Sequence, residues 1–252
     1  MRIALKFAYD GKAFYGYARQ PELKTVEGEI IKSLVKHSII EDTKEAMFRS
    51  ASRTDKGVSA LGNVIAFNTD APKKRILEGL SDTIPNIVFY GVAEVEPNFY
   101  PRHANQRIYR YHLKKLHSDI DQIISVLSLF TGEHDFTNFA RIEDFKDPIR
   151  SIDNIIITEN DDFLIIDFHA QTFLWHQIRR IISALMKIGT GKLEKEQVIE
   201  ALENPNKKVD FGLAPAEPLI LKDIIYDFDF EIDKKLQRDL ALFEKRINPK
   251  GN

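Results

Sequence analysis

Asp55 stands in a segment whose residue types suit acid–base or nucleophilic chemistry: Arg53-Thr54-Asp55-Lys56-Gly57-Val58-Ser59-Ala60. Apolar, strand-like runs precede and follow it, which predicts a loop on a rigid sheet, where functional residues concentrate. Arg53 and Lys56 flank the carboxylate, and nearby positive charge favours its ionised form. Gly57 lets the backbone turn or approach a ligand closely. Taken alone, the same pattern also fits a hairpin turn with a solvated ion pair.

Basic residues alternate with aromatic ones in a window without acids, residues 97–118, and a second acid-free window covers residues 168–193. The net charge of −2 hides an asymmetry: residues 1–115 carry 19 basic and 13 acidic residues, and the remainder carries 17 and 25. Basic and aromatic side chains together suit phosphate contacts and base stacking. Charge alone favours the simpler interpretation, a solvated strand face and a solvated helix face.

The segment around Asp55 resembles the signature loop of the TruA family of tRNA pseudouridine synthases. Other segments resemble further family motifs in the same order, from Ile3 to Leu221: Tyr9-Asp10-Gly11, Phe14-Tyr15-Gly16-Tyr17, Arg19-Gln20, Thr25–Glu29, Phe99–His103, Arg107–Tyr111, Thr131–Phe139, Phe173–Arg179 and Ala214–Leu219. The resemblance implies an enzyme that converts uridine to pseudouridine in tRNA.

The resemblance also assigns roles to individual residues. Asp55 is the catalytic residue, either as a nucleophile or by assisting glycosidic cleavage. Tyr109 stacks on the flipped uracil and helps to remove the C5 proton, although an ordinary core aromatic fits an alternating strand too. Arg179 pairs with Asp55, although a boundary arginine that points to solvent fits the same helical position. RNA contacts are expected from Arg53, Lys56, Arg19, Arg102, Arg107, Arg110, Lys114 and Lys115.

Four positions depart from bacterial-type members of the family: Ser52, Lys56, Ser59 and Pro218 stand where those members have Gly, Ala, His and Gly. Lys56, Ser59 and Pro218 are more similar to the archaeal and eukaryotic branch, which includes enzymes with other target positions. The expected substrate is the anticodon arm of tRNA, on the 3′ side of the stem-loop, and other uridines stay open. A homodimer is expected because bacterial members bind one tRNA across two subunits.

The composition of the chain excludes several kinds of site and protein class. The chain has no cysteine, which excludes disulfides, thiolate metal sites and a cysteine nucleophile. The seven histidines show no paired metal-ligand spacing. Pseudouridine formation conserves all atoms, so no cofactor or metal is expected. Without an apolar stretch that could span a bilayer or a signal peptide at Met1–Lys6, a cytoplasmic protein without membrane contact is expected.

Three other interpretations of the sequence compete with a pseudouridine synthase. Glycoside-cleaving enzymes usually need two carboxylates beside the bond, and the nearest acids in sequence, Glu45 and Asp70, lie on or beyond the neighbouring strands. An aspartic protease needs a small hydroxyl residue after the aspartate, where this chain has Lys56. A catalytically silent RNA-binding module would use the basic windows but leaves Asp55 unexplained.

Hydrophobic periodicity predicts an α+β protein. In the first half, expected strands at 2–9, 45–52, 63–68 and 87–95 and helices at 26–35 and 73–82 give a ferredoxin-like order. In the second half, strands are expected at 106–116, 151–158, 163–170 and 219–226, and helices at 119–130, 174–188 and 195–202. The resemblance implies two ferredoxin-like halves, 1–105 and 106–228, that form one continuous mixed sheet with a central cleft. A charged helical tail is expected at 229–252.

Overall fold

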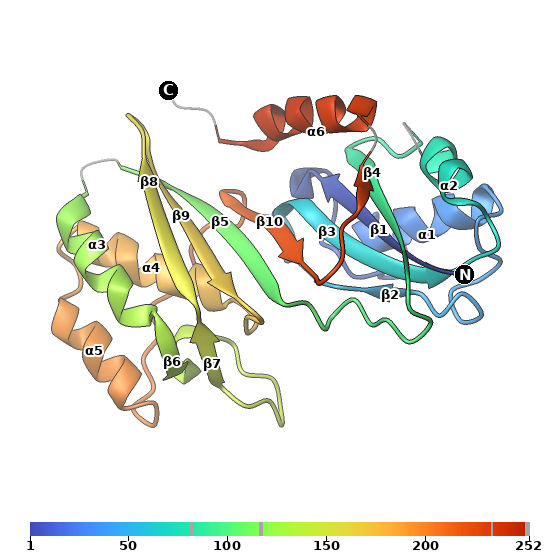
Figure 1. The fold of residues 1–252 in the computed structure, drawn as a ribbon. Coiled ribbons are helices and arrows are strands. Elements are labelled where there is room, and N and C mark those ends of the chain that lie inside the picture. The colour runs from blue at the N-terminus through green and yellow to red at the C-terminus, as the bar shows by residue number, and fades with distance from the viewer. Residues whose placement is uncertain (81–82, 116–117, 233, 250–252) are drawn as a thin grey trace. The chain divides into compact units, whose positions relative to one another are not determined.

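The computed structural model describes residues 1–80, 83–115, 118–232 and 234–249. The chain divides into two compact units, each with its own strands and helices (Figure 1). The first unit contains Met1–Asn105 and Ile220–Pro249, and the second contains Gln106–Leu219. The C-terminal part of the chain therefore returns to the unit that contains Asp55.

The sheet of the first unit has the strand order of a ferredoxin-like fold. Its elements are β1 (Arg2–Tyr9), α1 (Val26–Lys36), β2 (Arg49–Ser50), β3 (Ser59–Asn68), α2 (Lys73–Leu80) and β4 (Ile87–Val95), with a short 3-10 turn at Gly11–Ala13. β1 lies between β4 and β3, and β2 pairs with the other edge of β3, all antiparallel. Two later strands extend the sheet: β10 (Leu219–Ile225) runs parallel to β3, and β11 (Glu231–Ile232) pairs with β4. The result is a mixed sheet with helices, and the predicted α+β class is confirmed.

The central strand β1 is more buried than its alternating sequence predicts. Alternation favours a strand with one buried face, yet seven of its eight residues are buried. The second face is covered by α6 (Lys234–Ile247). Apolar side chains of this helix form one cluster with residues of the sheet: Leu236, Phe243 and Ile247 with Ala8, Leu61, Tyr90 and Ile220. The amphipathic C-terminal helix thus completes the core of the first unit.

The predicted strand at 45–52 is wrong in extent, because only Arg49–Ser50 pairs as a strand. The Asp42 carboxylate accepts hydrogen bonds from the backbone N–H of Lys44 and of Glu45, at 2.6 and 3.0 Å. Local bonds then continue the turn up to Phe48. An aspartate that bonds its own following backbone competes with strand pairing.

The second unit contains three neighbouring antiparallel strands, a two-stranded ribbon and three helices. Its elements are β5 (Gln106–Lys114), α3 (Ile120–Leu127), β6 (Gly132–Asp135), β7 (Ile149–Ile152), β8 (Asn154–Glu159), β9 (Phe163–Ala170), α4 (Gln177–Gly189) and α5 (Lys195–Glu203), with 3-10 turns at Ser128–Phe130 and Thr137–Phe139. β9 lies between β5 and β8, and β6 pairs with β7. α3 and α4 lie side by side (Figure 1), and Gly189 allows their close approach because a Cβ there would lie 2.7 Å from Ile123.

Two predictions for this unit need correction, and one strand was not predicted. The single strand expected at 151–158 is two strands that meet at Asp153, whose N–H bonds to the carbonyl of His169. β6 was not predicted, because Gly132–Asp135 is polar and has no apolar alternation. The helix expected from Leu174 begins at Gln177 instead, because His176 has a left-handed backbone with φ of 64°.

No helix among the described residues is long and apolar enough to cross a membrane.

Candidate active site

Three hydrogen bonds from neighbouring elements hold the loop around Asp55 in the first unit. The N–H of Tyr17 donates to the carbonyl of Thr54 at 3.2 Å. The hydroxyls of Tyr9 and Thr54 lie 2.7 Å apart, and the amide of Asn63 donates to the carbonyl of Ser52 at 3.0 Å. The opening segment of the chain and β3 therefore hold the residues directly before Asp55, Ser52 and Thr54, on a rigid support.

Glycine makes this support possible. A Cβ on Gly11 would lie 2.1 Å from the carbonyl oxygen of Val58, so only glycine fits against the loop there. Gly57 has φ of 88°, in the left-handed region that favours glycine. The N–H of Gly11 donates to the hydroxyl of Ser59 at 3.0 Å. Ser59 thus fastens the opening segment to the end of the loop.

Asp55 is partly exposed, and charged residues adjoin it in the sequence. The ammonium of Lys56 lies 4.3 Å from the ring centroid of Tyr15, a cation–π contact between two exposed side chains. Arg53 and Arg19 are exposed too. The loop of the first unit therefore carries a partly exposed carboxylate between two exposed cations of the same segment, Arg53 and Lys56.

Tyr109 lies on β5 of the second unit, opposite Phe168 of β9. Its ring is partly exposed and packs edge-on against Phe173, with 5.3 Å between centroids and 87° between planes. Edge-to-face contact leaves the orientation of the Tyr109 ring well defined. A partly exposed aromatic ring on a strand suits stacking against a base.

Arg179 lies in the first turn of α4 and is held by the closing segment Ala214–Leu219. Its Nε donates to the carbonyl of Ala214 at 2.9 Å, and its own carbonyl accepts from the N–H of Ala214 at 3.1 Å. The same segment bonds β5: the N–H of His112 donates to the carbonyl of Pro218, and the hydroxyl of Tyr111 to that of Pro215. This segment therefore ties the helix that carries Arg179 to the strand that carries Tyr109.

Burial sets the protonation of two residues beside Tyr109 on the same strand. Burial raises the pKa of the Tyr111 hydroxyl far above its usual range, which keeps this hydroxyl a neutral donor to Pro215. Burial is also the main cause that lowers the pKa of His112, and the neighbouring Arg110 adds to it. His112 is 6% exposed and is neutral at pH 7.

The basic residues predicted to bind RNA differ in what they contact. Arg110 makes a bidentate ion pair with Asp167, at 2.7 and 2.8 Å. Arg107 is buried and donates to the carbonyl of Gln171, and Lys115 pairs with Glu159 at 2.6 Å. Arg102 is exposed and Lys114 is partly exposed. The basic residues between positions 102 and 115 thus differ: Arg107, Arg110 and Lys115 have polar partners within the protein, and Arg102 and Lys114 are at least partly exposed.

Asp55 belongs to the first unit, and Tyr109 and Arg179 belong to the second. The first unit holds a carboxylate on a supported loop, and the second holds a partly exposed ring and a guanidinium on elements that the closing segment links. Among the residues that the structure describes, no group of His, Asp and Glu could hold a metal ion.

Sequence reasoning missed Asn63, which is fully buried and bonds to the Asp55 loop. Its only signal was an amide within an apolar strand, where a buried polar group needs a partner. It also missed the contact between Trp175 and Arg141, whose guanidinium lies 4.1 Å from the ring centroid. These residues are 34 positions apart, and no local pattern links them.

Known proteins are similar to this chain in sequence along nearly its whole length. Residues 126–227 match the protein family described as tRNA pseudouridine synthase. A protein of Thermococcus sibiricus named tRNA pseudouridine synthase A is 47% identical over 256 residues, which cover 98% of this chain and 95% of that protein. Its namesake in Pyrococcus furiosus is 42% identical, with 96% and 91% covered, and that in Thermococcus kodakarensis is 42% identical, with 95% and 92% covered. The similarity therefore extends over both units.

Proposed function

The chain belongs to the family of tRNA pseudouridine synthase A, and on this premise we propose that it isomerises uridine in the anticodon arm of tRNA, with Asp55 as the catalytic residue. The enzyme class is an isomerase that converts uridine to pseudouridine. The observation that carries the role of Asp55 is its loop: a partly exposed carboxylate on a segment fixed by Tyr9, Tyr17 and Asn63.

The reaction breaks the bond between N1 and C1′, turns the base, and joins C5 to C1′. The proton that leaves C5 is balanced by the one that N1 gains, so no atom enters or leaves overall. Asp55 attacks or assists at C1′ while the base is out of the stack, in a pocket that compensates the lost stacking. Tyr109 stacks on the uracil, and stacking suits it better than acting as a base because a neutral phenol is a weak base.

Arg179 pairs with Asp55 in this proposal. It lies in the first turn of α4, and the N-terminal end of a helix adds a field that favours negative charge. Arg53 assists base extrusion or holds a phosphate. Arg19, Lys56, Arg102 and Lys114 supply further contacts to the RNA backbone.

A pseudouridine assay on unmodified tRNA transcripts tests this function. The wild-type protein should form pseudouridine, and Asp55→Asn and Asp55→Ala should lose at least three orders of magnitude in rate while keeping their fold and most of their tRNA affinity. Substantial turnover by either variant would remove Asp55 from the chemistry. tRNA binding without turnover by the wild-type protein would favour the silent RNA-binding module.

The same reaction products locate the target. Carbodiimide-blocked primer extension should place the product on the 3′ side of the anticodon stem-loop, and product confined to other arms would instead indicate a family member with another target. We also propose a homodimer in the cytoplasm. Light scattering at concentrations where the enzyme is active tests this, and a monomer would contradict it.

A further inference from the structure

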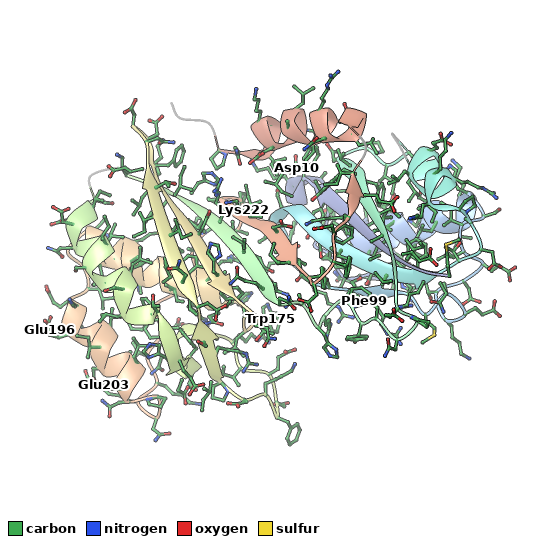
Figure 2. All side chains as sticks on the ribbon, in the orientation of Figure 1. Asp10, Phe99, Trp175, Glu196, Glu203 and Lys222 are labelled. Atoms are coloured by element: carbon green, nitrogen blue, oxygen red, sulfur yellow. The ribbon has the colours of Figure 1, made fainter. Side chains whose placement is uncertain are left out.

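Trp175 is the only tryptophan of the chain, and the residue is 41% exposed. It lies between β9 and α4, and Figure 2 shows it near the end of β9. Its carbonyl accepts a hydrogen bond from the N–H of Arg141 at 2.7 Å, and the next residue, His176, has the left-handed backbone that begins α4. The backbone is therefore fixed on both sides of a large aromatic ring that reaches the surface.

Arg141 adds a cation to this ring. Its guanidinium lies 4.1 Å from the centroid of the indole, well within the range of a cation–π contact. Arg141 is exposed, and no ion pair found among the described residues contains it. A guanidinium stacked on a ring keeps its N–H donors at its edge, where they suit a phosphate or a base.

We propose that Trp175 and Arg141 form a stacking platform for an unpaired base of the RNA substrate, with the edge of Arg141 directed to an adjacent phosphate. That this RNA is tRNA rests on the proposed function. Stacking on an aromatic ring accepts any base, because every base has a π-face. Phe173, two residues before Trp175, packs against Tyr109 at 5.3 Å, so the platform adjoins the segment that supports the proposed uracil-stacking ring.

A purely structural role predicts something different. If the contact only clamped the segment after Arg141 to the start of α4, RNA would leave the environment of the indole unchanged. The structure offers a matched contact of that kind: Arg246 lies 4.6 Å from the ring centroid of Phe243, which is 5% exposed in the core of the first unit. No base can stack on a ring that is buried to this extent.

Because Trp175 is the only tryptophan, intrinsic fluorescence excited at a wavelength that the eight tyrosines do not absorb reports on this residue alone. Titration with an unmodified tRNA transcript should quench the emission in a saturable way, and saturating tRNA should protect the remaining emission from acrylamide. Emission and acrylamide quenching that stay unchanged while an independent anisotropy assay shows saturated binding would overturn the platform.

Substitutions give a second readout. Trp175→Leu should weaken tRNA binding roughly tenfold or more, and Trp175→Phe should recover part of this loss because a smaller ring still stacks. Arg141→Ala should weaken binding and diminish its salt dependence, whereas Arg246→Ala should leave both unchanged. Equal binding by Trp175→Leu and wild type, or equal effects of Arg141→Ala and Arg246→Ala, would contradict the proposal.

The platform and the proposed function fail in different ways. If the protein binds tRNA with quenching of Trp175 but forms no pseudouridine, the result supports the stacking platform and contradicts the proposed activity. If the protein forms pseudouridine without a change in Trp175 fluorescence, and the Trp175→Leu variant binds tRNA normally, the result supports the activity and contradicts the platform.

Discussion

Two neighbouring arginines on α4, Arg179 and Arg180, have different partners. Arg179 bonds to the backbone of Ala214, in the segment that also ties β5, and Arg180 pairs with Asp210 at 3.0 Å. The Asp210 side chain is 75% exposed, so this second pair adds little to stability. Of these two adjacent residues, Arg179 thus contacts the closing segment, and Arg180 contacts a carboxylate that is exposed to solvent.

If Arg179 stabilises the charge of Asp55 during the reaction, Arg179→Ala should lower the single-turnover rate by about two to three orders of magnitude. Arg180→Ala should change this rate by less than about threefold, because it removes only a surface ion pair. Single-turnover assays with saturating enzyme compare the two variants directly. Equal and mild effects would make Arg179 one more phosphate contact.

His112 makes the stability of the second unit depend on pH. Its folded-state pKa is lowered, chiefly by burial, so the unfolded chain binds a proton more readily than the folded one. Stability is then fully present above the unfolded pKa of about 6.5 and is lost as pH falls toward the folded pKa. For one proton, the slope in this window is at most about 1.4 kcal/mol for each pH unit.

Urea unfolding at pH 7.5, 6.5 and 5.5 measures this loss. His112→Gln should flatten the profile between pH 6.5 and 5.5, whereas His103→Gln, at an exposed histidine, should reproduce the wild-type profile. A His112→Gln variant that loses as much stability as wild type over this range would assign the pH dependence to other groups.

At the scale of elements, the opening turn at Gly11–Ala13 acts as the support of the Asp55 loop. Gly11→Ala would place a Cβ 2.1 Å from the carbonyl oxygen of Val58, so the backbone of the loop must move. We expect a loss of stability of about 1–3 kcal/mol and a clear drop in kcat, because Asp55 moves with the loop.

Gly79→Ala is the matched control for this substitution. It lies on α2 and its Cβ would have no neighbour closer than 3.8 Å. Alanine there should be neutral or stabilise by about 0.5–1 kcal/mol, since it favours the helix. Urea midpoints and kcat of both variants test the idea, which fails if Gly11→Ala retains wild-type activity.

Periodicity predicts most of the elements because apolar residues recur where strands and helices bury them. It finds β1, β4, β9 and α5 within about one residue, and the α4 stripe from Ile178 to Ile188. It fails where local geometry sets the boundary of an element. Examples are the hydrogen bonds of the Asp42 carboxylate and the left-handed backbone of His176, which follow no periodic pattern. It also fails at contacts distant in sequence.

The candidate site shows the same division. The residues of the Asp55 loop are contiguous, so their sequence alone predicts a supported carboxylate among cations. The groups that support this loop come from Tyr9, Tyr17 and Asn63, and only the fold brings them to it. The link from Arg179 to Ala214 spans 35 residues and follows from no spacing rule. Sequence predicts the chemistry of the groups, and the fold decides their positions.

At the scale of the whole molecule, a net charge of −2 requires RNA affinity to come from a few well-placed cations. Each phosphate that a cation neutralises adds about 0.7 to 0.9 to the slope of log affinity against log salt concentration. Arg102 is exposed, whereas Arg110 is held by Asp167, whose side chain is 8% exposed. The two arginines should therefore affect tRNA binding in different ways.

Arg102→Ala should reduce the salt slope of tRNA binding by about one phosphate contact and leave the urea midpoint unchanged. Arg110→Ala should leave the slope unchanged but destabilise the protein by roughly 3–5 kcal/mol, because it leaves the buried carboxylate of Asp167 without its bidentate partner. Fluorescence anisotropy from 50 to 300 mM salt, combined with urea unfolding, separates the two outcomes. A stable Arg110→Ala variant with a lower salt slope would mean that Arg110 leaves Asp167 and contacts the RNA when tRNA binds.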